Sequence, residues 1–194
     1  EKIRRVFRVL DQAQSSYASP LARLLQEVII AREEANDNRK YLGTIKRWVK
    51  KLDGNSAFED ITEIFKPMLH VILLIWKNSK HYNDPPRLKV LIREICNAII
   101  NQAMKFVCGT EVFELIENEE SQQAIDKLNM VIDVCSTFKD MYGDYQTTAN
   151  AECPKNPWRI QNNVLFVRLD SFLERCHDIL ELTKTIIDFM KLER

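Results

Sequence analysis

Residues 162–194 read NNVLFVRLDSFLERCHDILELTKTIIDFMKLER, a stretch that contains neither proline nor glycine. Its apolar side chains recur every seven positions in three rows: Leu165, Phe172, Ile179, Ile186; Phe166, Leu173, Leu180, Ile187; and Leu169, Cys176, Thr183, Met190, with Thr183 the one polar member. Three apolar positions per heptad make a stripe wider than the seam of a simple coiled coil. The stretch therefore predicts one long helix that packs against several neighbours in a bundle.

The composition of the whole chain favours the same all-α fold class. The chain has 194 residues with four glycines and six prolines, too few turn residues for an all-β fold. Long apolar-periodic segments joined by short polar loops predict an elongated array of antiparallel long helices. The chain is expected to be a fragment (1–194) of a larger protein, and sub-bundles 1–109 and 110–194 are one way to divide it.

Charge and hydropathy exclude several classes of protein. Lysine plus arginine and aspartate plus glutamate are 28 each, whereas a nucleic-acid-binding protein usually carries a basic excess. The most apolar run, Val71 to Trp76, is far shorter than the roughly 18 residues of a membrane helix. We expect neither a nucleic-acid nor a membrane partner. Five widely spaced cysteines without a CxxC pair are interpreted as reduced, largely buried thiols of an intracellular protein.

Capping and breaking residues divide the rest of the chain. Gly109 is the expected end of one helix, Thr110 the expected cap of a short one with Phe113 facing inward, and Pro67 is expected to kink or split its helix. Acidic residues favour a helix start near Ser56, after a turn at Asp53-Gly54-Asn55. The predicted helices are 1–15, 19–52 with Ser19 and Pro20 at its start, 56–76, 85–108, 110–117 and 124–149.

No signature of a catalytic, cofactor-binding or metal site occurs in the sequence. The P-loop, the dinucleotide-binding glycine motif, the H-E-x-x-H motif and the EF-hand loop are all missing. His70 lies among apolar residues, which favours a core histidine over a catalytic base. Cys176 beside His177 is interpreted as a buried thiol next to a surface imidazole, and the acids at 117, 119 and 120 as a solvated loop. We therefore predict a chain that is not an enzyme and holds no cofactor.

Four residues are candidates for contacts with a partner protein. Trp158 follows a proline-containing loop, and it is either an interface anchor or a core side chain. Arg4, Arg5 and Arg8 form a local basic cluster with Lys2. The cluster is either a solvated helix face or a contact for an acidic partner surface.

Several segments together resemble one known family. They are Asn150-Ala151-Glu152-Cys153-Pro154, Asn156-Pro157-Trp158-Arg159-Ile160, the run from Leu165 to Cys176, and, upstream, the runs from Leu69 to Trp76 and from Leu91 to Asn97. These segments resemble the N-terminal tail region of axonemal dynein heavy chains, and the outer-arm type most closely. The resemblance is strong over residues 60–194 and looser over residues 1–59.

The resemblance implies a structural role in a motor complex of the ciliary or flagellar axoneme. In this family the ATPase motor lies far downstream, and the tail consists of helical bundles. The implied partners are other dynein heavy chains, intermediate and light chains, and docking proteins on doublet microtubules. The resemblance implies no catalytic residue in this segment. The alternative, from residue chemistry alone, is a free-standing helical adaptor with one apolar groove for a partner helix.

Overall fold

A computed structural model describes residues 1–54, 57–118 and 120–192 of the chain. Helices account for nearly all of these residues and no strand occurs among them, so the predicted all-α class is confirmed. The chain forms two compact units, unit 1 (Glu1–Gly43) and unit 2 (Thr44–Arg194). The expected roles of Asn55, Ser56 and Glu119 lie outside the described residues.

Unit 1 consists of α1 (Lys2–Gln12) and the first part of α2 (Ala18–Asp53), joined by a tight reversal. Gln14 adopts a left-handed backbone with φ 50°, and the Ser15 N–H donates to the Leu10 carbonyl at 3.0 Å. Such a left-handed residue commonly ends a helix because its turn satisfies the last carbonyls. The first helix therefore stops before the predicted residue 15. Pro20 falls in the first turn of α2, where no backbone hydrogen is needed.

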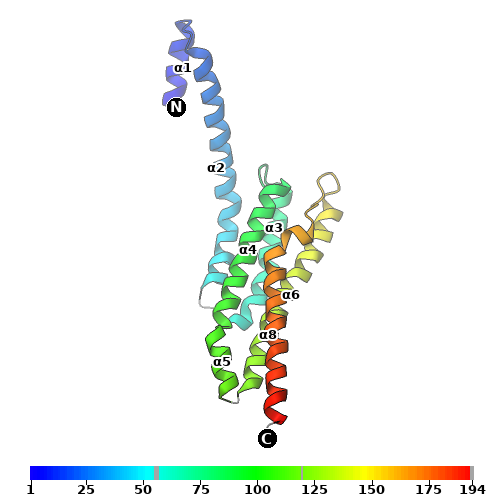
Figure 1. Ribbon diagram of the computed structural model, residues 1–194. Helices are drawn as coiled ribbons and strands as arrows, with labels where there is room; N and C mark the ends of the chain where they lie inside the picture. Colours follow the sequence, from blue (N-terminus) through cyan, green and yellow to red (C-terminus); the bar gives the residue numbers. More distant parts are fainter. Residues whose placement is uncertain (55–56, 119, 193–194) are drawn as a thin grey trace. The chain divides into compact units, whose positions relative to one another are not determined.

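Unit 2 begins with the end of α2 and continues through seven further elements. They are η1 (Phe58–Asp60), α3 (Ile61–Asn78), α4 (Pro85–Phe106), α5 (Gly109–Glu117), α6 (Ser121–Glu152), α7 (Asn162–Leu165) and α8 (Val167–Leu192). Helix α6 contacts α3, α4, α5 and α8, and α4 contacts α8. Consecutive long helices of this unit run in opposite directions (Figure 1), as the short connections predict.

An aromatic cluster fills the centre of unit 2. The Phe65 and Phe138 rings meet edge to face at a centroid distance of 5.1 Å, and Tyr142 meets Phe166 at the same distance. All four side chains are fully buried. Aromatic rings bury 150–250 Å² each, at about 25 cal/mol per Å², so each ring of this cluster makes a large contribution to the apolar burial of the unit. The α3 segment from Leu69 to Trp76, predicted to be central, supplies most of the surrounding core.

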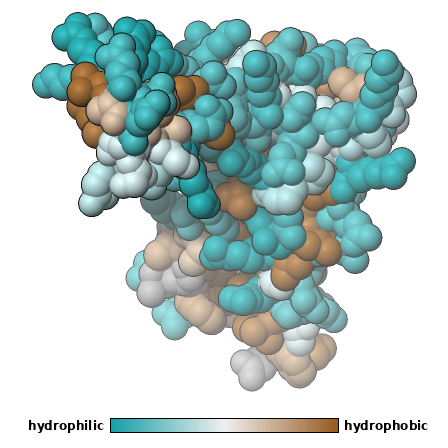
Figure 2. Space-filling view, turned by 90° about the horizontal axis from the view of Figure 1, so that it is seen from above, coloured by the Kyte–Doolittle hydropathy of each residue, from teal (hydrophilic) through white to brown (hydrophobic). Residues whose placement is uncertain are grey.

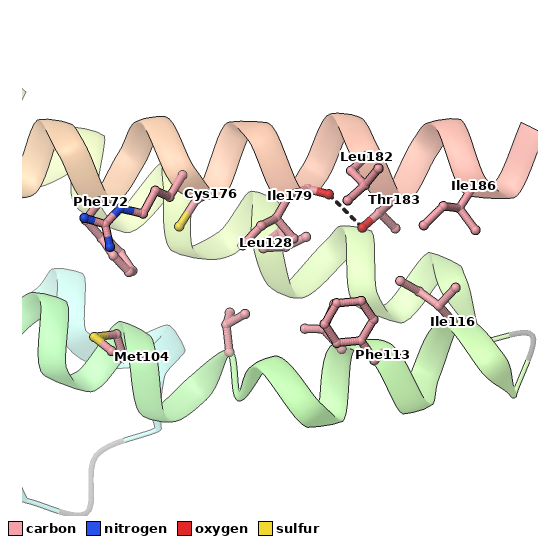
Figure 3. Close-up of a pocket in the computed structure, with 13 residues that line it drawn as sticks. Met104, Phe113, Ile116, Leu128, Phe172, Cys176, Ile179, Leu182, Thr183 and Ile186 are labelled. Atoms are coloured by element: carbon pink, nitrogen blue, oxygen red, sulfur yellow. Dashed lines mark hydrogen bonds between the residues drawn. The ribbon is translucent and has the colours of Figure 1, made fainter.

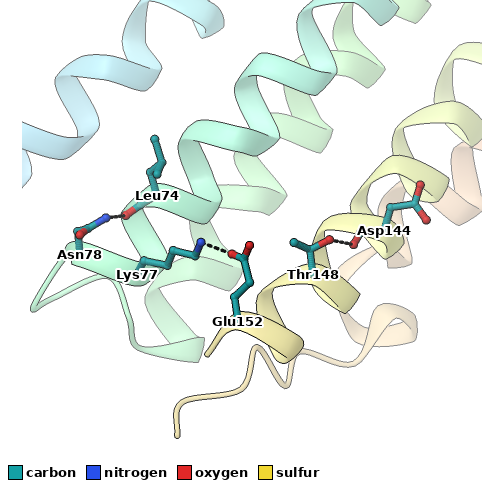
Figure 4. Close-up of polar contacts among 6 residues, drawn as sticks. All are labelled: Leu74, Lys77, Asn78, Asp144, Thr148 and Glu152. Carbon is teal, nitrogen blue, oxygen red and sulfur yellow. Dashed lines mark hydrogen bonds and ion pairs between the residues drawn. The ribbon is translucent and has the colours of Figure 1, made fainter. Parts of the chain in front are cut away.

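Polar contacts fix the loop between α6 and α7 to the bundle. The Gln146 side-chain amide donates to the Trp158 and Ile160 carbonyls at 3.1 and 2.8 Å. The Trp76 indole N–H donates to the Asn156 carbonyl at 3.1 Å. Lys77 of α3 forms an ion pair with Glu152 at the end of α6 (Figure 4). The carbonyls of this loop are thus used by side chains from two helices, which positions α8 on the bundle.

Of the kink or split predicted at Pro67, the split does not occur, because helix α3 continues through this residue and packing on both sides of it outweighs the lost hydrogen bond. Two further predictions about helix ends are wrong. The final helix is interrupted at Phe166, which separates α7 from α8. Gly109 begins α5 instead of ending α4, and the N-cap is Cys108 instead of Thr110.

The division at residue 109 is also different from the one observed. Helices on both sides of that residue, α4 and α8, lie in contact within unit 2. The division falls at residue 43 instead, within a continuous helix. The reason is that α6 and α8 complete the core begun by α3 and α4, so the two proposed sub-bundles share one core.

Candidate partner-binding surfaces

The three heptad rows of the final helix differ in burial. Leu169, Cys176 and Thr183 of one row are buried, and the Thr183 hydroxyl donates to the Ile179 carbonyl at 2.8 Å, which satisfies the polar member. In contrast, Ile179 is exposed and Ile186 is only half-buried. The row that contains Ile179 and Ile186 is therefore not covered on one side by the rest of the chain.

The open row forms one wall of an apolar groove in unit 2. The opposite wall comes from the end of α4 and from α5, and Leu128 of α6 lies between them (Figure 3). The groove has a volume of about 270 Å³. We call it the α5/α8 groove; its lining residues are Met104, Val107, Val112, Phe113, Ile116, Leu128, Phe172, Arg175, Cys176, Ile179, Leu182, Thr183 and Ile186.

Two side chains make the α5/α8 groove accessible. Phe113 was predicted to face the core, but it is 62% exposed, and Leu182 is 55% exposed. The short helix α5 buries Val112 and Ile116 against Ala124, which leaves Phe113 at the mouth of the groove. Arg175 is the single charged residue of the lining. Such a surface suits apolar side chains of a protein segment and offers no arrangement for acid–base chemistry.

Sequence reasoning missed Leu182. The signal was present, since Leu182 and Phe189 are seven residues apart and are both exposed. They add two apolar positions beside the three rows described above, in the second half of the helix only, because Arg168 and Arg175 occupy the earlier positions of the same series. Apolar positions beyond those that a bundle interior needs indicate an outward apolar face at this end of the helix.

Trp158 is a core residue and not a surface anchor. Its side chain is fully buried, stacked on Trp76 at 5.8 Å and edge to face with Tyr142 at 5.5 Å. Of the two interpretations that the sequence left open for Trp158, the burial supports the core side chain. The reason is that the stiff loop before α7 folds inward over the aromatic cluster, which the sequence did not show.

Arg4, Arg5 and Arg8 lie exposed on α1. The Arg5 guanidinium pairs with the Glu1 carboxylate at 2.9 Å. A second groove of about 560 Å³, within unit 1, brings the three arginines together with Arg32 of α2. Arg32 could not be grouped with them from the sequence, because only the reversal at Gln14 places α2 beside α1. That these arginines contact a partner stays a prediction.

Of the two predictions about histidines, one is wrong and one is confirmed. His70 is exposed, with its ring 6.5 Å from that of Tyr145, so its assignment to the core is wrong. It occupies the outer face of α3, where the apolar pattern of its neighbours is interrupted. Cys176 is buried and His177 exposed, as predicted. Over the part of the chain that the structure covers, no group of three or more His, Cys, Asp or Glu residues could hold a metal ion.

All five cysteines are free thiols. Burial raises the pKa of Cys96 and of Cys135 to about 12, and that of Cys176 to about 11. Such thiols are unreactive because the thiolate is the nucleophile. Cys108 is exposed and Cys153 half-buried, so the prediction of largely buried cysteines holds for three of the five.

Comparison with known proteins identifies the chain. The family described as "Dynein heavy chain, N-terminal region 1" matches residues 1–194. The dynein beta chain of the flagellar outer arm of Chlamydomonas reinhardtii is 43% identical over the whole chain. The chain belongs to the dynein heavy-chain family. Human dynein axonemal heavy chain 9 is 36% identical over 98% of this dynein segment.

The segment is short compared with these relatives. It spans 4% of the length of each of the two relatives. A dynein of the flagellar inner arm I1 complex of Chlamydomonas reinhardtii is 28% identical over 93% of this chain, so the outer-arm beta chain is the more similar of the two. The predicted place of the segment in the axoneme of cilia or flagella is confirmed by the flagellar, ciliary and axonemal relatives. Within the described ranges, every helix is too short or too polar to span a bilayer.

Proposed function

We propose that this segment is a non-catalytic assembly element of an axonemal dynein tail. It helps to hold the motor complex together and to anchor it on the doublet microtubule, and ATP hydrolysis belongs to other parts of the protein. The observation that carries the proposal is the α5/α8 groove on a helical unit with a well-packed core. A rigid bundle with an open apolar row suits the docking of a neighbouring chain.

The packing of unit 2 supports the mechanical part of this role. Four long helices lie side by side around one aromatic cluster, and ion pairs such as that of Lys139 with Asp170 at 2.5 Å tie α6 to α8. Close-packed interiors have low compressibility and transmit strain. Force from a distant motor would therefore pass through the unit to its anchor.

The proposed partners are other heavy chains, intermediate and light chains, and docking proteins on the doublet. The free-standing adaptor is the weaker candidate, although it too requires an apolar groove. Membership of the dynein heavy-chain family favours the tail role, in which the groove is one contact within a larger assembly.

A matched pair of substitutions on α8 tests the role of the groove. Leu182 lines the groove and is 55% exposed, whereas Val167 lies on the same helix outside it and is 53% exposed. In the full-length heavy chain, Leu182→Asp is expected to reduce co-sedimentation with the other subunits, because it places a charge in an apolar contact. Val167→Asp is the control and should assemble normally. Equal assembly of both variants would overturn the docking role of the groove.

Cross-linking mass spectrometry on the intact ciliary complex identifies the partners. Lys105, Lys155 and Lys191 sample different parts of unit 2. Links from these lysines to another heavy chain, an intermediate chain or a docking protein support an assembly role. Links confined to the same heavy chain would reduce the segment to an internal spacer and contradict the proposal.

A further inference from the structure

Unit 1 has helices but no interior. None of its residues, all of which the structure describes, is buried. Apolar side chains of both helices remain in contact with solvent, among them Ile3, Val6, Leu24 and Val28. Two helices alone rarely bury a stable core, because most helical stability comes from packing an apolar face against neighbours. Within residues 1–43, unit 1 therefore encloses no core of its own.

The groove between α1 and α2 shows what kind of neighbour fits. Its α2 wall presents Leu25, Val28 and Ile29 at the spacing that places residues on one helix face. Arg32 continues the same face one turn further. Its α1 wall presents Arg4, Arg5 and Arg8 at equivalent helical spacing. We call this site the arginine groove: an apolar strip on one helix beside a basic row on the other.

The positive charge of the arginine groove is largely uncompensated. Glu1 is the one acidic residue of the lining, and its carboxylate is paired with Arg5. Arg4, Arg8 and Arg32 have no ion pair with any residue that the structure describes. Three guanidinium groups around an apolar strip repel one another and favour a ligand with carboxylates and an apolar face.

We propose that the arginine groove binds an acidic amphipathic helix of another polypeptide in the dynein complex. The apolar residues of that helix, at i, i+3, i+4 and i+7, pack on Leu25, Val28 and Ile29. Its aspartate and glutamate side chains pair with Arg4, Arg8 and Arg32. The three helices then enclose the core that unit 1 lacks alone. The inference rests on the proposed assembly role, which assigns the helix to a different chain.

The shape of the site favours a helix over an anionic lipid surface. A membrane-binding helix offers its apolar face on a convex surface that lies flat in the interface. Here the apolar strip lies in a groove of about 560 Å³ between two helices, with arginines along one wall. A cylinder with an apolar face fits this groove, whereas a flat bilayer would touch only its rims.

Photo-cross-linking in the intact complex tests the site directly. A benzophenone amino acid replaces Val28 of the full-length heavy chain, which lines the groove and is 42% exposed. The matched control replaces Ile30, which lies on the same helix outside the lining and is 50% exposed. We expect the Val28 probe to link to an acidic helical segment of another subunit, and the Ile30 probe to give no such link.

Charge reversal tests whether the arginines recruit that helix. Arg4→Glu with Arg8→Glu is expected to lower the yield of the Val28 cross-link roughly tenfold, because like charges across an interface are strongly unfavourable. Arg23→Glu is the control, since Arg23 lies on α2 outside the groove. It should leave the yield unchanged. Circular dichroism of each variant verifies that the helices remain.

Each other outcome overturns the inference. Links from Val28 only to the same heavy chain would mean that an internal segment fills the groove, and links to lipid would mean a membrane contact. Equal loss of yield in the double variant Arg4→Glu with Arg8→Glu and in the control Arg23→Glu would show a general charge effect. Because Leu182→Asp tests assembly through the α5/α8 groove, its effect can persist while the Val28 probe fails, and only the present inference then falls.

Discussion

Units 1 and 2 use the same helix-forming patterns but reach different states of burial. Helix α2 belongs to both units, and its two buried side chains, Ile45 and Leu52, come after residue 43. Before that point the helix carries an apolar face of similar kind, with Leu25 and Ile29 only half-buried. The difference shows that an apolar stripe identifies the helix face that can pack against other helices. Whether a core forms there depends on how many helices meet.

Removal of a central aromatic side chain should give the largest effect. Trp158→Ala in the 194-residue chain is expected to lower the free energy of unfolding by about 3–5 kcal/mol, because a cavity replaces a fully buried ring. Tyr17→Ala in unit 1, where the ring is exposed, should cost less than about 0.5 kcal/mol. Chemical denaturation measures both. Similar losses for the two variants would erase the contrast between the units.

Alkaline pH should destabilise unit 2 through its buried thiols. Cys96 and Cys135 have pKa values of about 12 in the folded state, compared with a reference of 9.0, so the unfolded state releases protons first. Stability is thus fully present below pH 9 and falls as the pH rises toward 12. The expected loss by pH 10 is on the order of 1 kcal/mol for each thiol. The variant Cys96→Ala with Cys135→Ala should show a shallower decline in denaturation curves measured from pH 8 to 10.

Phe172→Ala should have an effect between that of a fully buried ring and that of an exposed ring. Phe172 is half-buried and lines the α5/α8 groove, so we expect a loss of about 1–2 kcal/mol, less than for a central ring. Urea denaturation of the 194-residue chain measures this. A loss as large as that of Trp158→Ala would place Phe172 in the core and close the groove at that end.

Phe113→Ala should have the smallest effect on stability. The ring is 62% exposed, so its removal should change the free energy of unfolding by less than about 0.5 kcal/mol. The same variant in the full-length heavy chain is expected to weaken assembly, if the α5/α8 groove is a docking surface. A large loss of stability without any change in assembly would make Phe113 a structural residue.

Periodicity was sufficient to locate most of the helices. The segments predicted at 19–52, 85–108 and 124–149 correspond to α2, α4 and α6, because their apolar residues recur at helical spacing. The errors occur where a single residue was weighed alone. Gly109 was predicted to end a helix but begins α5, and the split that was one of two outcomes predicted at Pro67 does not occur.

The candidate surfaces were less predictable than the helices. The basic row on α1 is visible in the sequence, but its neighbour Arg32 is not, since 24 positions separate Arg32 from Arg8. Phe113 was predicted to face inward but is exposed, and the sequence did not decide between the surface and the core for Trp158. A helical stripe indicates which residues share a face, and only the packing of the other helices shows whether that face is covered.

The sequence by itself determined the helical class, the family and the apolar rows, because these depend on spacing along the chain and on residue identity. The tertiary structure alone decided which rows are covered. It folded the loop before α7 inward so that Trp158 is buried, left Phe113 and Leu182 beside an open groove, and brought Arg32 next to the arginines of α1. The physical reason is that burial depends on contacts between segments distant in sequence, and no local pattern specifies those contacts.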